Sequence, residues 1–140
     1  LFPYTTLFRS VSVASISLFV GAIGIMAIML SRVYQRVREI GIMKTVGMTT
    51  KDVLLVFLAE SGMIGLIGGI SGILLSLAVF PILQLASKIR SGVTLAIKPV
   101  FSVETIGIAL AVSIIVGIIA GIYPAWRASR LTVIEAIRQE

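Results

Sequence analysis

Three long apolar segments constrain this chain more than any other feature of its sequence. Residues 11–30 carry only serines as polar side chains, residues 53–85 carry a single carboxylate, Glu60, and residues 103–122 carry Glu104 only at their edge. About 20 apolar residues in a helix cross the roughly 30 Å hydrocarbon core of a bilayer. The sequence therefore predicts an all-α integral membrane protein with three transmembrane helices over these ranges.

Composition supports a membrane location and disfavours most enzyme classes. Hydrophobic residues make up 58% of the 140 residues and charged residues 13%, against roughly a quarter charged in soluble domains. The chain has no cysteine and no histidine, which excludes disulfides, thiol chemistry and histidine acid–base catalysis. We therefore expect no catalytic, cofactor or metal site, and we attribute the net charge of +6 to membrane topology rather than to nucleic-acid binding.

The basic residues divide unequally between the two sides that three crossings define. One side holds Arg9, Lys88, Arg90 and Lys98. The other holds the connection 31–52 and the C-terminal tail, with Arg32, Arg36, Arg38, Lys44, Lys51, Arg127, Arg130 and Arg138. Because cytoplasmic loops are enriched in lysine and arginine, this bias predicts that the connection and the C-terminus are cytoplasmic in a multi-pass protein of the plasma membrane.

The connection 31–52 has the pattern of an amphipathic helix. Val33, Val37 and Ile40 follow one another at helical spacing, whereas Arg36 and Glu39 fall on another face. Such a helix either lies on anionic lipid headgroups or docks on a cytosolic protein. The spacing alone leaves both interpretations open.

Local signals place several helix ends. Thr49 with Asp52 forms a capping-box pattern that predicts the start of the second long helix, and Pro81 is expected to kink or end its outer part. Thr132 with Glu135 repeats the capping pattern and predicts a short cytoplasmic helix at the C-terminus. The third span is followed by residues typical of a membrane interface, Tyr123, Pro124 and Trp126.

Small residues within the spans predict close helix packing, with a dimer or sliding interface as the alternative. The glycines at GxxxG spacing are Gly65, Gly68, Gly69, Gly72, Gly117 and Gly121. Glu60 is the one carboxylate inside the second span, and we expect it to pair with an arginine of the connection near the inner interface. A proton relay would require further intramembrane polar partners, and the sequence offers none.

The first ten residues, LFPYTTLFRS, fit neither the apolar helix nor a capping segment. We therefore expect residues 1–10 to be a foreign leader outside the first helix.

Residues 11–140 resemble the FtsX-like permease domain of MacB-type ABC transporters, specifically its C-terminal three-span portion. The resemblance rests on an EIGxxKxxG core at residues 39–47, an FLxE motif at residues 57–60 and a YPAxxA motif at residues 123–128. It implies that the connection 31–52 couples to a separate cytosolic ABC ATPase, and that the permease forms a homodimer or heterodimer. The residues implied as ATPase contacts are Arg38, Glu39, Ile40, Gly41, Lys44 and Gly47.

The function implied by this resemblance is that of a permease subunit. Such a subunit would transmit ATP-driven motion across the membrane for export or extraction of a substrate. The alternative is a regulatory membrane module, similar to the cell-division members of the family, that controls an extracytoplasmic cell-wall hydrolase. No phosphate-binding GxxxxGK[ST] motif is present in the sequence, so any dependence on ATP must come from another polypeptide or from a missing region. We expect ATP hydrolysis on a separate nucleotide-binding subunit.

Overall fold

The computed structural model describes residues 2–91, 101–134 and 138 of the chain. In these residues the regular structure consists of four helices, α1 (Phe2–Gln35), α2 (Val37–Thr45), α3 (Thr50–Ser91) and α4 (Val103–Ser129). Three of them, α1, α3 and α4, are long and apolar enough to cross a membrane. The predicted all-α membrane architecture with a short helix between the first two spans is therefore confirmed.

Helix α1 is longer than the predicted first span. It has 34 residues, or roughly 51 Å at 1.5 Å per residue, so it exceeds the hydrocarbon thickness. Residues 2–10 belong to this helix, although the sequence analysis placed them outside it. Pro3 permits this because it lies in the first turn, where its missing N–H removes no intrahelical hydrogen bond.

Helices α3 and α4 also pass beyond their expected ends. Helix α3 continues through Pro81 to Ser91, and α4 continues through Pro124 to Ser129. In a membrane every backbone polar group needs a partner within the protein. Proline is tolerated inside spanning helices because neighbouring helices and local adjustments satisfy the backbone groups that it leaves free. The C-terminal helix predicted from Thr132 and Glu135 lies partly outside the described residues, since Glu135 is not among them.

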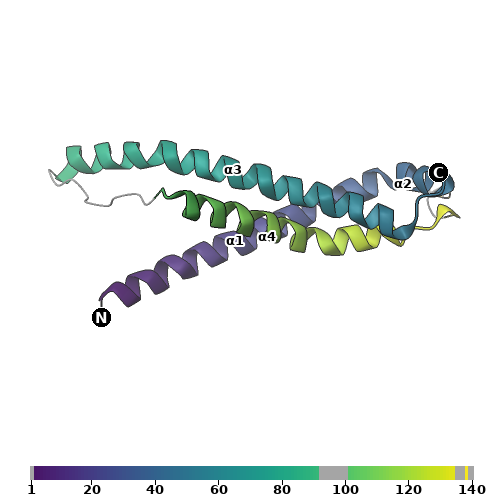
Figure 1. The fold of residues 1–140 in the computed structure, drawn as a ribbon, viewed down its shortest axis with the longest axis horizontal. Helices are drawn as coiled ribbons and strands as arrows, with labels where there is room; N and C mark the ends of the chain where they lie inside the picture. The colour runs from purple at the N-terminus through teal and green to yellow at the C-terminus, as the bar shows by residue number, and fades with distance from the viewer. Residues whose placement is uncertain (1, 92–100, 135–137, 139–140) are drawn as a thin grey trace.

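The tightest contact of the bundle joins α3 to α4, which lie side by side and antiparallel (Figure 1). A Cβ atom on Gly65 would stand 2.5 Å from the carbonyl oxygen of Ser113 and 3.2 Å from the Cα of Gly117. A Cβ on Gly69 would meet the Ser113 side chain at 2.9 Å. The Ser113 hydroxyl also donates a hydrogen bond to the Gly65 carbonyl at 2.5 Å. Glycine at these positions is what permits the close approach.

The six predicted packing glycines do not all share this interface. Gly117 and Gly121 lie on the α4 side of it, each against Ser61 of α3. Gly68 and Gly72 differ, because no described atom lies within 4 Å of a Cβ built on either residue. One GxxxG pair of α3 is therefore in tight contact with α4, whereas a Cβ on either glycine of the other pair would meet no described atom.

All four helices meet at the end of the bundle that carries α2 (Figure 1). The buried cluster at this end consists of Met29 and Val33 from α1, Ile40 from α2, Val53 and Phe57 from α3, and Ala125 and Ala128 from α4. Toward its N-terminus α1 leaves the other helices, and its large apolar side chains there are exposed. In a membrane those side chains would lie against lipid.

Candidate functional site

Helix α2 lies against the bundle with one face. Val37 and Ile40 are buried, and Gly41 beside them is buried as well. These positions recur at spacings of three and four residues, so they form a single stripe along the helix. Two of the six residues implied as ATPase contacts, Ile40 and Gly41, are therefore in the core rather than on the surface.

The opposite face of α2 is open. Arg38 and Glu39 are exposed there, and Glu39 forms an ion pair with Arg36 at 3.4 Å between Oε2 and Nε. Ile42 and Val46 are exposed beside them, at 55% and 83%. The sequence analysis did not name these two apolar residues as contacts, although their four-residue spacing outside the buried stripe could have identified them.

Lys44 turns toward the bundle instead of outward. Its ammonium group donates hydrogen bonds to the carbonyl oxygens of Ser129 at 2.5 Å and of Leu131 at 2.8 Å, at the C-terminal end of α4. The last carbonyls of a helix lack intrahelical partners, and the negative end of the helix dipole favours a cation there. Lys44 of α2 therefore caps the C-terminal end of α4. The sequence analysis assigned this lysine to ATPase contact, but its ammonium group is bonded within the bundle.

Gly47 ends α2 in a left-handed turn. Its φ is +111°, the N–H of Met48 donates to the Met43 carbonyl at 3.1 Å, and the N–H of Gly47 donates to the Lys44 carbonyl at 3.2 Å. This is the hydrogen-bond pattern of a Schellman C-cap, which glycine adopts without strain. Gly47 is exposed, but its position in the sequence is explained by the turn.

The capping box predicted at the start of α3 is confirmed. The backbone N–H and the hydroxyl of Thr49 donate to Asp52 Oδ2 at 2.9 and 2.6 Å, and the N–H of Asp52 donates back to the Thr49 hydroxyl at 3.3 Å. Helix α3 begins at the next residue, Thr50. The reciprocal bonds fix the angle at which the chain enters the second span.

Glu60 of α3 forms an ion pair with Arg32, in the last turn of α1. The carboxylate is only a quarter exposed, whereas the arginine side chain is about half exposed. Pairing of this kind offsets the cost of a carboxylate close to the hydrocarbon. The pair also connects α1 to α3, about one helical turn before the end of α1 at Gln35.

Two arginines near the end of α4 stack on aromatic rings. Arg127 lies 5.3 Å from the ring centre of Tyr34 in α1, and it donates a hydrogen bond to the Tyr123 hydroxyl at 3.3 Å. Arg130 lies 5.2 Å from the Trp126 ring. Arginine and aromatic side chains gather at membrane–water interfaces, so a cluster of this composition is typical of one boundary of a bilayer.

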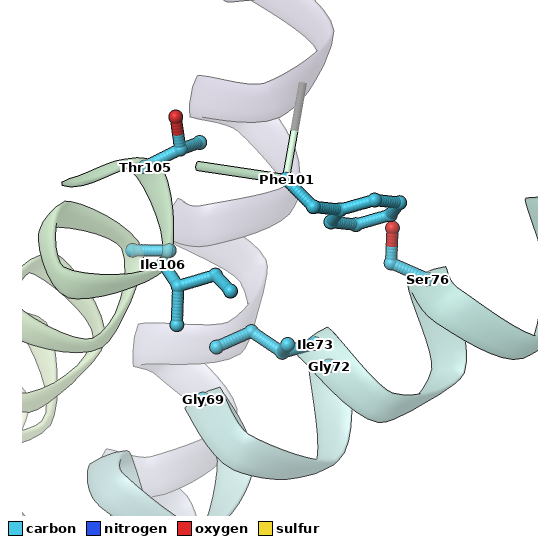
Figure 2. Close-up of a pocket in the computed structure, with 8 residues that line it drawn as sticks. Gly69, Gly72, Ile73, Ser76, Phe101, Thr105 and Ile106 are labelled. Carbon is cyan, nitrogen blue, oxygen red and sulfur yellow. The ribbon is translucent and has the colours of Figure 1, made fainter. Parts of the chain in front are cut away.

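A separate hollow of about 330 Å³ lies between α3 and the beginning of α4, away from α2 (Figure 2). Its lining is almost entirely apolar, with Ile73 and Ile106 facing each other and the hydroxyls of Ser76 and Thr105 as the polar groups. Gly69 and Gly72 lie in its wall. No titratable side chain is among the described lining residues, so the hollow has the properties of an apolar surface rather than of a reaction site.

These features define the class of the protein. Three apolar helices, two of them packed through glycine faces, form with a short amphipathic helix at one end the membrane part of a multi-pass protein. The chain belongs to the FtsX-like permease family, because the family's C-terminal domain model matches residues 11–133.

The curated relatives that the chain matches are named as permeases or ATP-binding/permease proteins. It is 44% identical over 129 residues to the macrolide export ATP-binding/permease protein MacB of Pasteurella multocida, covering 92% of this chain and 19% of MacB. It is 43% identical over 129 residues to the pyoverdine export ATP-binding/permease protein PvdT of Pseudomonas syringae pv. tomato, covering 92% and 18%. An uncharacterized ABC transporter permease of Methanocaldococcus jannaschii is 40% identical over 131 residues, covering 93% and 32%. The chain thus spans a fifth to a third of the length of these relatives.

Proposed function

We propose that this chain is the C-terminal membrane part of an ABC-type export permease, and that the open face of α2 docks the ATP-hydrolysing partner. The observation that carries the proposal is the division of α2 into two faces. Ile40 is fully buried in a cluster that contains side chains from all three long helices, whereas Arg38 and Glu39 are exposed. A partner bound to the open face would therefore act on a helix packed into the junction of the bundle.

The docking surface consists of Arg38, Glu39, Ile42 and Val46. It combines opposite charges with exposed apolar side chains, a combination that suits a specific protein contact better than a headgroup layer. A helix lying on anionic lipid would present a more uniformly basic face. Glu39 is unfavourable for such lipid, and its carboxylate, paired with Arg36 but 63% exposed, can accept a further cationic group from a partner.

The names of the relatives support ATP-driven export as the activity. MacB and PvdT are both named as ATP-binding/permease export proteins, one for macrolides and one for pyoverdine. The two names specify different cargo, so they assign no cargo to this chain. In our proposal ATP hydrolysis belongs to a separate nucleotide-binding subunit. None of these names favours the alternative role in controlling a cell-wall hydrolase.

We place α2 and the C-terminal tail on the cytoplasmic side. Arg32, Arg36, Arg127 and Arg130 lie at this end of the bundle, as the enrichment of basic residues on the cytoplasmic side requires. A permease dimer is part of the proposal. It is supported by Gly68, a small residue on a spanning helix where an added Cβ would have no described atom within 4 Å. Lipid would cover the remaining exposed apolar surface.

The test is binding of the ATPase subunit by the full-length permease in membranes. Glu39→Lys should weaken binding by about tenfold or more, which corresponds to about 1.4 kcal/mol, because it reverses a charge within the interface. The matched control is Glu104→Lys, which reverses an exposed carboxylate at the far end of the bundle. Unchanged binding by Glu39→Lys, with normal membrane insertion, would refute docking on α2.

A variant at Gly41 is unsuitable for this purpose. A bulky residue at that buried position would disturb the packing of α2, so a loss of binding would not distinguish docking from misfolding.

A further inference from the structure

The hydrogen bonds of Lys44 join α2 to a part of the chain that docking on α2 does not involve. The ammonium group bonds to Ser129 and Leu131, which are 85 and 87 residues further along the sequence. Both acceptors are backbone carbonyl oxygens, so the contact depends on the position of α4 and not on the identity of its side chains. Helix α2 is therefore held to the end of α4 by a charge-assisted contact.

The end of α4 is itself tightly bonded. The Ser129 hydroxyl donates to the Trp126 carbonyl at 2.7 Å, and the N–H of Arg130 donates to the same carbonyl at 3.2 Å. Ser129 is buried, with 2% of its surface exposed. A displacement applied to the Ser129 carbonyl would thus move the last turn of α4 as a unit rather than stretch a loose tail.

Lys44 also shares the inward face of α2 with the buried stripe. It lies four residues after Ile40, which is fully buried in the cluster that also contains Ala125 and Ala128 of α4. Both helices contribute to this apolar cluster, but hydrophobic burial is non-directional and does not by itself fix the register of one helix against the other. The directional bonds of Lys44 fix the register of α2 against α4.

We infer that Lys44 is a positioning residue that makes α4 follow α2, so that motion imposed on α2 is transmitted along α4 to the far side of the membrane. This inference rests on the proposed function, because the motion of α2 is attributed to the docked ATPase. The route runs from the exposed face of α2, through the Lys44 ammonium and the carbonyls of Ser129 and Leu131, into the helix that ends there.

The experiment measures nucleotide-dependent movement at the other end of α4. Val103, the first residue of α4, is 88% exposed, and the 140 residues contain no cysteine. Val103→Cys therefore provides a single reporter in this region, with any cysteine elsewhere in the full-length permease replaced. Its rate of reaction with a maleimide is compared with and without ATP, in membranes that contain the permease and its ATPase subunit. ATPase binding and ATP hydrolysis are measured in parallel.

The decisive variant is Lys44→Met, which keeps the length of the side chain and removes the donors and the charge. We expect it to reduce the ATP-dependent change in labelling rate by about fivefold or more, the lower end of ordinary coupling between distant sites, with ATPase binding retained. Lys44→Arg keeps a cation with several donors and should retain most of the response. Lys51→Met, which removes an exposed lysine in the first turn of α3, is the matched control and should leave the response unchanged.

A full labelling response in Lys44→Met would overturn the inference and leave docking on α2 intact. The same conclusion follows if the unmodified permease binds ATPase but shows no nucleotide-dependent change at position 103. If Lys44→Met does not insert into the membrane, Lys44→Gln replaces it, and a full response in that uncharged variant has the same meaning. Failure of the proposed function is a separate result, recognised by ATPase binding that Glu39→Lys leaves unaffected.

Discussion

Replacement of Gly65 by alanine should loosen the contact between α3 and α4. The new Cβ would lie 2.5 Å from the Ser113 carbonyl oxygen, whereas close carbon–oxygen contacts are about 3.3 Å or longer. The helices must therefore separate locally by about 0.8 Å, a gap that forfeits between about a quarter and a half of each optimal van der Waals contact. The hydrogen bond from the Ser113 hydroxyl to the Gly65 carbonyl would lengthen as well.

The expected cost is about 0.6–2.6 kcal/mol. Overpacking a well-packed contact costs about 1–3 kcal/mol, and loss of an interhelical hydrogen bond in a membrane costs about 0.6 kcal/mol. The better helix propensity of alanine returns up to about 1 kcal/mol. The assay is unfolding of the full-length permease in mixed micelles at increasing concentrations of sodium dodecyl sulfate, followed by pulse proteolysis.

Gly68→Ala is the matched control, on the same helix and less than one turn away. No described atom lies within 4 Å of its Cβ position, so this change should leave stability unchanged or raise it by up to about 1 kcal/mol. Equal destabilisation by the two substitutions would refute the assignment of the Gly65 face to α4. Unchanged stability of Gly65→Ala would show that the interface can relax by more than we calculate.

Three further predictions concern the polar contacts at the α2 end, and the same unfolding assay measures each of them. A double-mutant cycle with Arg32→Met and Glu60→Gln should give a coupling free energy of about 0.2–1 kcal/mol. The coupling should fall as salt is added, because the arginine side chain is about half exposed. A coupling indistinguishable from zero at low salt would contradict the pairing. Thr49→Ala should cost about 1 kcal/mol and speed amide exchange in the first turn of α3. Arg127→Gln should cost about 0.5–1 kcal/mol, and Tyr34→Leu should add little in that background because the stacking is already lost.

The apolar segments were sufficient to predict the three spans but not where their helices end. Hydropathy locates the part of a helix that lies in hydrocarbon, whereas a helix continues into water wherever its backbone bonds can still form. Pro81 illustrates the difference, since it lies inside a helix of 42 residues that extends to Ser91. The start at Thr50 was predictable because a capping box is a local signal, complete within four residues.

Sequence spacing also could not distinguish the two GxxxG pairs of α3. Gly65 with Gly69 and Gly68 with Gly72 have the same spacing and the same residue type. The two pairs are offset by three residues, so they lie on adjacent parts of the helix surface, and only the position of α4 decides which pair it contacts. A pattern within one helix therefore predicts that a flat face exists, and the neighbouring helix determines its use.

The residues of α2 illustrate how far periodicity alone can reach. Val37, Ile40, Gly41 and Lys44 follow the spacing i, i+3, i+4, i+7, so a strict helical reading places Lys44 on the buried stripe and not among the ATPase contacts. A lysine on such a stripe requires an acceptor, because an unpaired buried cation is costly. The acceptors are backbone carbonyls at the end of α4, and every residue has such a carbonyl, so no residue type in the sequence identifies them. The inward direction of Lys44 was therefore predictable from the sequence, whereas its hydrogen bonds to α4 could be recognised only in the folded structure. Through these bonds, a partner docked on α2 would act on a helix that crosses the membrane.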